Sequence, residues 1–271
     1  VQERVLAVSD HLLAGTMDFL GARCLSMADY PPIRPFLERA LAIREQNLGP
    51  THLDTAESLS ILAVYLCHTG DPADRAAARP LHERALAIQE QTLGPKHPAT
   101  ATSLYNLAVY HLETDLEAAR TLYERALAIQ EQTLGPQHPA TASTLCGLAT
   151  CLLETGDPHK IAEVRPLFER ALTIKKQSLG AAHPDTAWLL NTLAGYLQRT
   201  GDPADLAAAR PLFERALAIR EQALGPSHPD MAWSLTSLAI YLVETGDPAD
   251  RAAARPLYER ALAIREQAVG P

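Results

Sequence analysis

A short phrase, Arg-Ala-Leu-Ala-Ile, recurs in register along almost the whole chain, with one alanine exchanged in the fourth copy. Its last residue falls at six positions: Ile43, Ile88, Ile129, Ile174, Ile219 and Ile264. The spacings between them are 45, 41, 45, 45 and 45 residues. Two other phrases, Leu-Gly-Pro-x-His-Pro and Thr-Gly-Asp-Pro, recur between these positions. A fixed period of this length is typical of stacked repeats, so the 271 residues predict one tandem array of six repeats.

Each repeat predicts a pair of helices, as residues 51–95 illustrate. Four apolar residues recur there at intervals of three and four: Leu59, Leu62, Ala63 and Leu66. This spacing predicts the core face of a first helix over about residues 54–69. Gly70 predicts a left-handed stop, and Asp71-Pro72 predict the cap and first residue of a second helix that ends near Leu93. No segment alternates with a period of two, so the sequence predicts no strands.

The repeats differ in regularity. We place them at about residues 10–50, 51–95, 96–136, 137–181, 182–226 and 227–271. The first repeat is degenerate. The third is four residues shorter, because Thr114-Asp115-Leu116 stands where other repeats carry a Pro-Ala-Asp insertion that we interpret as a longer loop. Prolines inside the second helix, such as Pro80, predict a mild kink or a later helix start. No polar capping helix follows Gly270-Pro271, so we expect a segment of a longer protein.

Five features carry a resemblance to a known family: Leu107-Ala108, Ala119, Tyr123, Ala126, and the connector at residues 135–139. With these residues the repeat resembles the tetratricopeptide repeat, in the variant typical of kinesin light chains. The resemblance covers nearly the whole chain and implies an all-α, right-handed superhelical solenoid of six helix-turn-helix repeats. It also implies that the first helix of each repeat lines a concave groove that binds a protein or peptide.

Composition and missing motifs exclude several functions. The net charge of -8 argues against a nucleic-acid surface. No apolar run approaches the eighteen or so residues of a membrane span. Four cysteines suit a reducing compartment, so we expect a cytoplasmic protein. Phosphate-binding loops, zinc-protease motifs and nucleophile elbows are absent from the sequence, which predicts no enzyme and no cofactor.

One histidine recurs in the connector before each first helix. The residues are His52, His97, His138, His183 and His228. Metal ligands must converge on one point, whereas equivalent residues of stacked repeats lie roughly 10 Å or more apart. We therefore predict that these histidines hydrogen-bond the connector and share no metal ion; a metal or catalytic role is the less favoured interpretation. Cys146 and Cys151 point to different faces of one helix, and we interpret them as small buried or groove residues.

Residues that vary among repeats on the outer face of the first helix are candidates for binding a partner. The candidates are Trp188, Asn191, Arg199, Trp233, Tyr105, Asn106 and Glu244. The two tryptophans occupy the same column in adjacent repeats, either as interface anchors or packed on their own loops. Arg199 has Glu154 and Glu244 on either side, so an acidic group could dock there. The family resemblance implies asparagines that hold a peptide backbone, and only Asn106 and Asn191 fit.

Two functions remain open at this point. The first is a non-enzymatic scaffold that captures a protein or peptide on its concave face. The second is a sensor or autoinhibitory arm of a larger signalling protein, of the STAND-type ATPase or CHAT-type protease class, with contacts to other domains of its own chain. In the first case Trp188→Ala and Arg199→Ala should each weaken binding by more than about tenfold.

Overall fold

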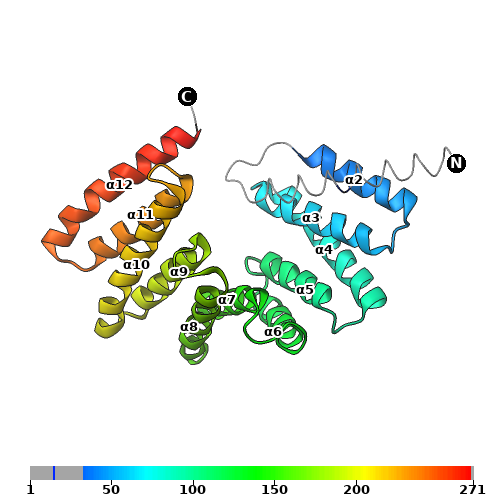
Figure 1. Ribbon diagram of the computed structural model, residues 1–271, viewed down its shortest axis with the longest axis horizontal. Coiled ribbons are helices and arrows are strands. Elements are labelled where there is room, and N and C mark those ends of the chain that lie inside the picture. The colour runs from blue at the N-terminus through cyan, green and yellow to red at the C-terminus, as the bar shows by residue number, and fades with distance from the viewer. Residues whose placement is uncertain (1–14, 16–32, 270–271) are drawn as a thin grey trace. The chain divides into compact units, whose positions relative to one another are not determined.

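The computed structural model describes Gly15 and residues 33–269, with the side chains of residues 158–162 and 268–269 left out. Regular structure in this part of the chain is α-helical, with no strand among the described residues (Figure 1). The all-α prediction is therefore confirmed. The chain divides into two compact parts, called here the N-terminal body (residues 1–136) and the C-terminal body (residues 137–271).

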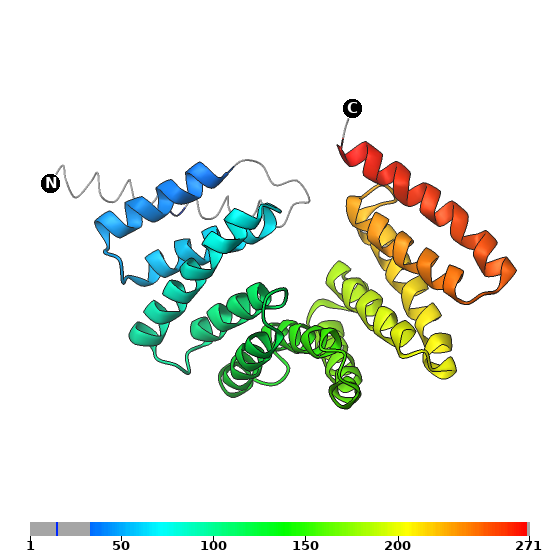
Figure 2. The ribbon, with the colours of Figure 1, turned by 180° about the vertical axis from the view of Figure 1, so that it is seen from behind.

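The C-terminal body holds three complete helix pairs. Its helices are α7 (Pro139–Glu154), α8 (Pro158–Leu179), α9 (Pro184–Thr200), α10 (Pro203–Leu224), α11 (Pro229–Glu244) and α12 (Pro248–Val269). Within each repeat the first helix packs along the second, as α9 does on α10 (Figure 2). The second helix then packs on the first helix of the next repeat, and α9 also touches α11. First helices and second helices therefore form separate layers of this body.

The N-terminal body follows the same pattern. Its described helices are α2 (Arg34–Asn47), α3 (Leu53–His68), α4 (Pro72–Leu93), α5 (Pro98–His111) and α6 (Leu116–Thr133). Here α3 packs along α4 and α5 along α6, while α4 joins the two repeats by packing on α5. Of the degenerate first repeat, α2 is the second helix, and the predicted first helix lies outside the described residues apart from Gly15.

A histidine caps the first helix of five repeats. The residues are His52, His97, His138, His183 and His228. In each case the ring nitrogen Nδ1 accepts a hydrogen bond from the backbone N–H two residues further on, at 3.1–3.2 Å. The ring thereby satisfies one of the N–H groups that have no partner inside the helix. The predicted local hydrogen bond of these histidines is confirmed, and its partner is the first turn of the following helix.

The turn between the paired helices also forms as predicted. Gly70 has a φ of +77°, a conformation that side chains with a Cβ avoid. The carboxylate of Asp71 accepts a hydrogen bond of 2.8 Å from the backbone N–H of Ala73, and Pro72 begins α4. The predicted stripe of the first helix is buried: Leu59, Leu62, Ala63 and Leu66 are each at most 5% exposed.

The length difference of the third repeat lies in a helix and not in a loop. Its second helix, α6, has 18 residues, whereas α4, α8, α10 and α12 have 22 each. The interpretation of Pro-Ala-Asp as a longer loop is therefore wrong. Proline is compatible with the first helical position, so these residues add about one turn to the helix start. The second helices also continue through Pro80, Pro166, Pro211 and Pro256, so the later helix start is wrong for these four repeats. In the described part of the first repeat, Pro35 lies in the first turn of α2.

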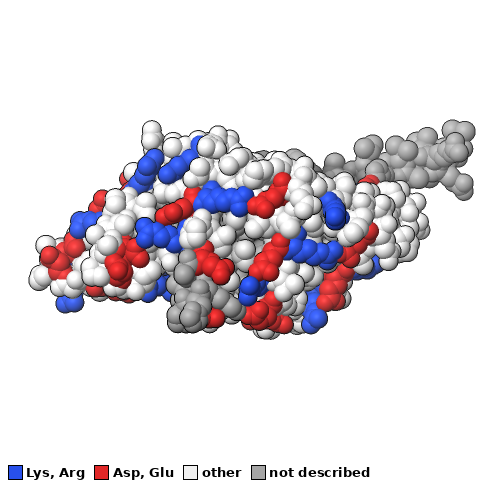
Figure 3. Space-filling view, turned by 90° about the horizontal axis from the view of Figure 1, so that it is seen from below, with Lys and Arg blue, Asp and Glu red and all other residues white. Residues whose placement is uncertain are grey.

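Basic and acidic side chains are interleaved on the surface. Six arginines of the second helices each pair with a glutamate four residues on: Arg34–Glu38, Arg79–Glu83, Arg120–Glu124, Arg165–Glu169, Arg210–Glu214 and Arg255–Glu259. Figure 3 shows this alternation on one face, where Lys and Arg side chains lie beside Asp and Glu and form no single basic patch. Exposed pairs of this kind contribute only a few tenths of a kcal/mol each, about 0.2–0.5.

Candidate functional site

A cavity of about 440 Å³ opens on the layer of first helices in the C-terminal body. Most of its wall comes from α7, α9 and α11, with Phe213 contributed by α10. The lining residues from the first helices are Thr150, Leu153, Glu154, Asn191, Thr192, Gly195, Tyr196, Gln198, Arg199, Trp233, Ser237, Ile240 and Glu244. Four of the seven predicted partner-binding residues are among them, namely Asn191, Arg199, Trp233 and Glu244. The cavity is therefore the candidate binding site of this chain.

A glycine in the middle of α9 leaves space in the cavity wall. Gly195 occupies a column in which the other first helices carry larger residues: Val64, Val109, Thr150 and Ile240. A Cβ atom built at Gly195 would meet no other atom within 4 Å. Glycine inside a helix destabilises it by about 0.5–1 kcal/mol relative to alanine. The open space beside Trp233 and Ile240 therefore lies at Gly195, a residue that is unfavourable for the stability of α9.

Asn191 is buried and bonded to the neighbouring repeat. Only 2% of the residue is exposed, and its Nδ2 donates a 3.0 Å hydrogen bond to Oγ of Ser237. The Ser237 hydroxyl itself donates to the carbonyl oxygen of Trp233 at 3.0 Å, so its Oγ must accept from Asn191 and the amide orientation is settled. The remaining amide oxygen, Oδ1, is buried and has no hydrogen-bond partner. A buried acceptor without a partner is unfavourable.

Two further polar contacts join adjacent repeats at the rim of the cavity. The guanidinium of Arg199 donates to a carboxylate oxygen of Glu154 at 3.1 Å. The side-chain amide of Gln198 donates to Glu244 at 2.6 Å. The two charged groups of the first contact neutralise each other, whereas the Glu244 carboxylate is bonded to an uncharged amide. The sequence places Arg199 between two glutamates, and the structure pairs it with Glu154.

The Trp233 side chain packs against Arg220 and is partly exposed to solvent. Its ring lies 4.8 Å from the guanidinium carbon of Arg220, a cation–π distance. Arg220 is itself buried and donates hydrogen bonds to Ser234 (2.6 Å) and to the backbone oxygen of Asp230 (3.2 Å). Burial lowers the pKa of Arg220, and the Asp230 charge opposes this effect. Trp233 nevertheless keeps 39% of its surface exposed, so both the packing role and the contact role proposed for it are compatible with this geometry.

The other predicted residues do not join this cavity. Trp188 lies on α9 with 44% of its surface exposed but does not line it. Tyr105 and Asn106 lie on α5 in the N-terminal body and are half-buried. The Tyr105 ring packs edge-on against Tyr123 with a centroid distance of 5.7 Å. The predicted set thus belongs to more than one surface.

The cysteines and possible metal ligands among the described residues form no further candidate site. Cys146 and Cys151 are buried, as expected, and burial raises the pKa of the Cys146 thiol to about 12, which keeps it protonated and unreactive. The described residues contain no group of three or more His, Cys, Asp or Glu side chains placed to hold a metal ion. Among the described helices, none is long and apolar enough to cross a membrane.

Two family models described as tetratricopeptide repeat match this sequence. One matches residues 74–132, 108–164 and 204–267, and the other matches residues 13–54. The chain belongs to the tetratricopeptide-repeat family. Repeats of this family generally mediate protein–protein interactions, and tetratricopeptide-repeat proteins are typically scaffolds without enzymatic activity. Among curated proteins, none matches the chain.

Solved structures support the same assignment. The nearly identical TPR-like repeats of a protein named as a kinesin light chain, from Podosopora anserina, share 28% identity and a TM-score of 0.62, covering 80% of this chain and 98% of that one. The Q17M form of that protein gives 27% identity and a TM-score of 0.63, covering 81% and 97%. BtubC (BKLC) from P. vanneervenii shares 21% identity and a TM-score of 0.67 over 95% and 93%, and supports the fold alone. The predicted kinesin-light-chain-like solenoid is confirmed.

Proposed function

We propose that this tetratricopeptide-repeat chain is a non-enzymatic scaffold that binds a protein or peptide partner in the cavity between α7, α9 and α11. The observation that carries the proposal is the opening of the wall at Gly195 beside the exposed ring of Trp233. Concave sites of this size with apolar walls and a few polar groups are typical binding sites. An aromatic side chain fixed in orientation before binding loses little entropy when a partner covers it.

Trp233→Ala tests this function most directly. We expect the variant to bind a partner more than about tenfold more weakly, because a central aromatic anchor contributes about 2 kcal/mol or more. The partner is first captured from a lysate of the source cell on the immobilised chain, and its dissociation constant is then measured by calorimetry. Thermal unfolding of the variant checks that the loss of the Arg220 contact has not unfolded the C-terminal body.

Tyr258→Ala is the matched control, because Tyr258 is an aromatic residue of the C-terminal body with the same exposed fraction as Trp233, 39%, and lies outside the cavity lining on α12. We expect it to bind the captured partner like the unmodified chain. If Trp233→Ala also binds normally, or Tyr258→Ala loses binding instead, the partner does not use this cavity.

A further inference from the structure

One buried acceptor of the cavity has no partner. Asn191 Oδ1 is buried without a hydrogen bond, while Asn191 Nδ2 donates to Ser237. At the rim, one carboxylate oxygen of Glu154 accepts from Arg199 and one of Glu244 accepts from Gln198. A hydrogen-bond donor on the ligand would satisfy Asn191 Oδ1 and could also bind the second oxygen of either carboxylate.

The charged side chains that line the cavity favour a cationic ligand. Its lining carries two carboxylates, Glu154 and Glu244, against one guanidinium, Arg199. Because Arg199 pairs with Glu154, the charge of Glu244 is the one without an opposite charge in the lining. The buried cation Arg220 is bound to Asp230 and Ser234 in the first two turns of α11, near the other end of that helix from Glu244.

Helix direction adds a third contribution. Glu154 is the last residue of α7, Glu244 is the last residue of α11, and Arg199 is the residue before the end of α9. Three helix C-termini therefore meet at the rim of the cavity. The carboxyl end of a helix carries a partial negative charge that favours nearby cations.

From these three observations we infer that the cavity takes a basic side chain, lysine or arginine, of a partner peptide. This inference rests on the proposed function and names the chemistry of its ligand. The aliphatic stem of the side chain fits the open space at Gly195, against Trp233 and Ile240, and its cationic head reaches the Glu244 carboxylate. Lysine and arginine both place an apolar stem and a charged tip in one residue. An acidic ligand would have to displace Glu154 from Arg199 and would face the Glu244 charge.

The test uses a phage library of random 12-residue peptides selected on the full 271-residue chain and counter-selected on Gly195→Val. Valine is the residue of two other repeats in this column, at Val64 and Val109, and it should fill the open space without harming the helix. Gly195→Ala is the matched control, since it stabilises the helix similarly but adds only one methyl group. Peptides that bind the chain and Gly195→Ala, but not Gly195→Val, depend on the cavity.

We expect the cavity-dependent peptides to be enriched in lysine and arginine. Their affinity, measured by fluorescence anisotropy, should fall about three- to fivefold in Glu244→Gln, the range of a partly exposed ion pair. It should rise in Arg199→Gln, which leaves Glu154 without its partner, and it should fall as salt is added. Glu113→Gln changes the equivalent residue of the N-terminal body, outside the cavity, and should leave the affinity unchanged.

The outcomes separate this inference from the proposed function. Cavity-dependent peptides that are acidic or uncharged, and that bind Glu244→Gln normally, contradict the basic ligand while the binding function stands. A selection in which no peptide distinguishes the chain from Gly195→Val contradicts both.

Discussion

At the scale of single residues, His82 is the clearest departure from the repeat pattern. Its column is otherwise occupied by apolar or aromatic side chains: Leu37, Tyr123, Phe168, Phe213 and Tyr258. His82 is only 2% exposed. Burial, together with the nearby His111, lowers the pKa of His82 to about 4. The ring is therefore neutral in the folded chain at pH 7, and folding opposes its protonation.

This shift predicts an acid-sensitive stability. The pKa of His82 is about 4 in the folded chain and 6.5 as its ordinary value, so between these pH values the unfolded state binds more protons. The free energy of unfolding should fall as the pH drops from about 6.5 towards 4, by roughly 3 kcal/mol in total, and this contribution should be constant below pH 4. Urea denaturation at a series of pH values measures the slope.

His82→Phe provides the control for this prediction, because phenylalanine is the residue of the fourth and fifth repeats in this column. The variant should lose most of the slope between pH 6.5 and 4. A smaller slope of the same sign should remain, because burial also lowers the pKa of His111. If His82→Phe keeps the full slope, the acid sensitivity arises elsewhere.

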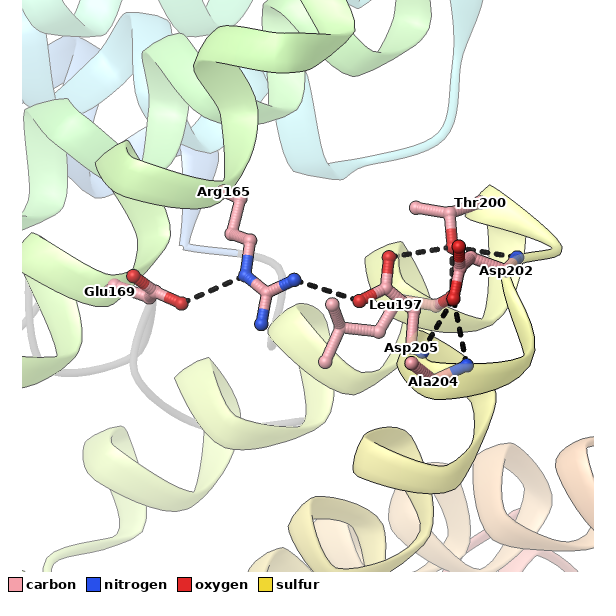
Figure 4. Close-up of polar contacts among 7 residues, drawn as sticks. All are labelled: Arg165, Glu169, Leu197, Thr200, Asp202, Ala204 and Asp205. Carbon is pink, nitrogen blue, oxygen red and sulfur yellow. Dashed lines mark hydrogen bonds and ion pairs between the residues drawn. The ribbon is translucent and has the colours of Figure 1, made fainter.

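At the scale of helices, the extra turn of the second helix carries a contact between repeats. In Figure 4 the guanidinium of Arg165 lies between two carboxylates, donating to Glu169 on its own helix at 3.0 Å and to Asp205 on α10 at 2.8 Å. Thr200 also donates to Asp205. The same contact recurs as Arg34–Asp74 and Arg210–Asp250. The aspartate belongs to the extra turn, so the shorter third repeat has no equivalent residue for Arg79 to reach.

A double-mutant cycle on Arg165→Ala and Asp205→Asn tests this contact. We expect a favourable coupling of about 0.2–1 kcal/mol in the free energy of unfolding, as for exposed ion pairs, which shrinks at high salt. A second cycle on Arg79→Ala and Asp205→Asn is the control. These residues belong to different bodies, and we expect no coupling between them. No coupling between Arg165 and Asp205 at low salt would show that the extra turn contributes only helix length.

At the scale of the whole molecule, stability is local because each repeat packs mainly on its neighbours. The helix contacts within each body join adjacent helices and the first helices of adjacent repeats. Arrays of this kind behave as sums of repeat and interface energies, so damage in one repeat propagates only to its neighbours.

Phe168→Ala tests this locality. The Phe168 side chain is fully buried in α8, and its ring faces that of Tyr196 on α9 at 6.1 Å. Its removal should destabilise the C-terminal body by about 3–5 kcal/mol. Hydrogen exchange should accelerate in α7 to α10 and remain unchanged in α3 and α4. Equal acceleration along the whole chain would mean that the described helices unfold as one cooperative block.

Most of the helical scaffold follows from the sequence alone. Helix ends, the buried stripe around Leu62 and the local hydrogen bonding of residues such as His138 depend on interactions within a few positions, and the repeats display each pattern several times. That these histidines cap the first helices is shown by the structure. The origin of the length difference in the third repeat is the element that the sequence leaves open: Asp71-Pro72 indicate a helix start, whereas the missing Pro-Ala-Asp suggests a shorter loop. Proline and alanine fit both, and packing against the preceding repeat favours the helix.

The site required the tertiary structure. The sequence placed Asn191, Arg199 and Trp233 on one face of the first helices, because helical periodicity alone determines the face. It could not show that Asn191 is buried against Ser237, or that Arg199 pairs with Glu154 and not with Glu244. These contacts join residues 45 or 46 positions apart. Their formation depends on the separation and rotation of neighbouring helices, which follow from packing of the whole layer and appear in no local pattern.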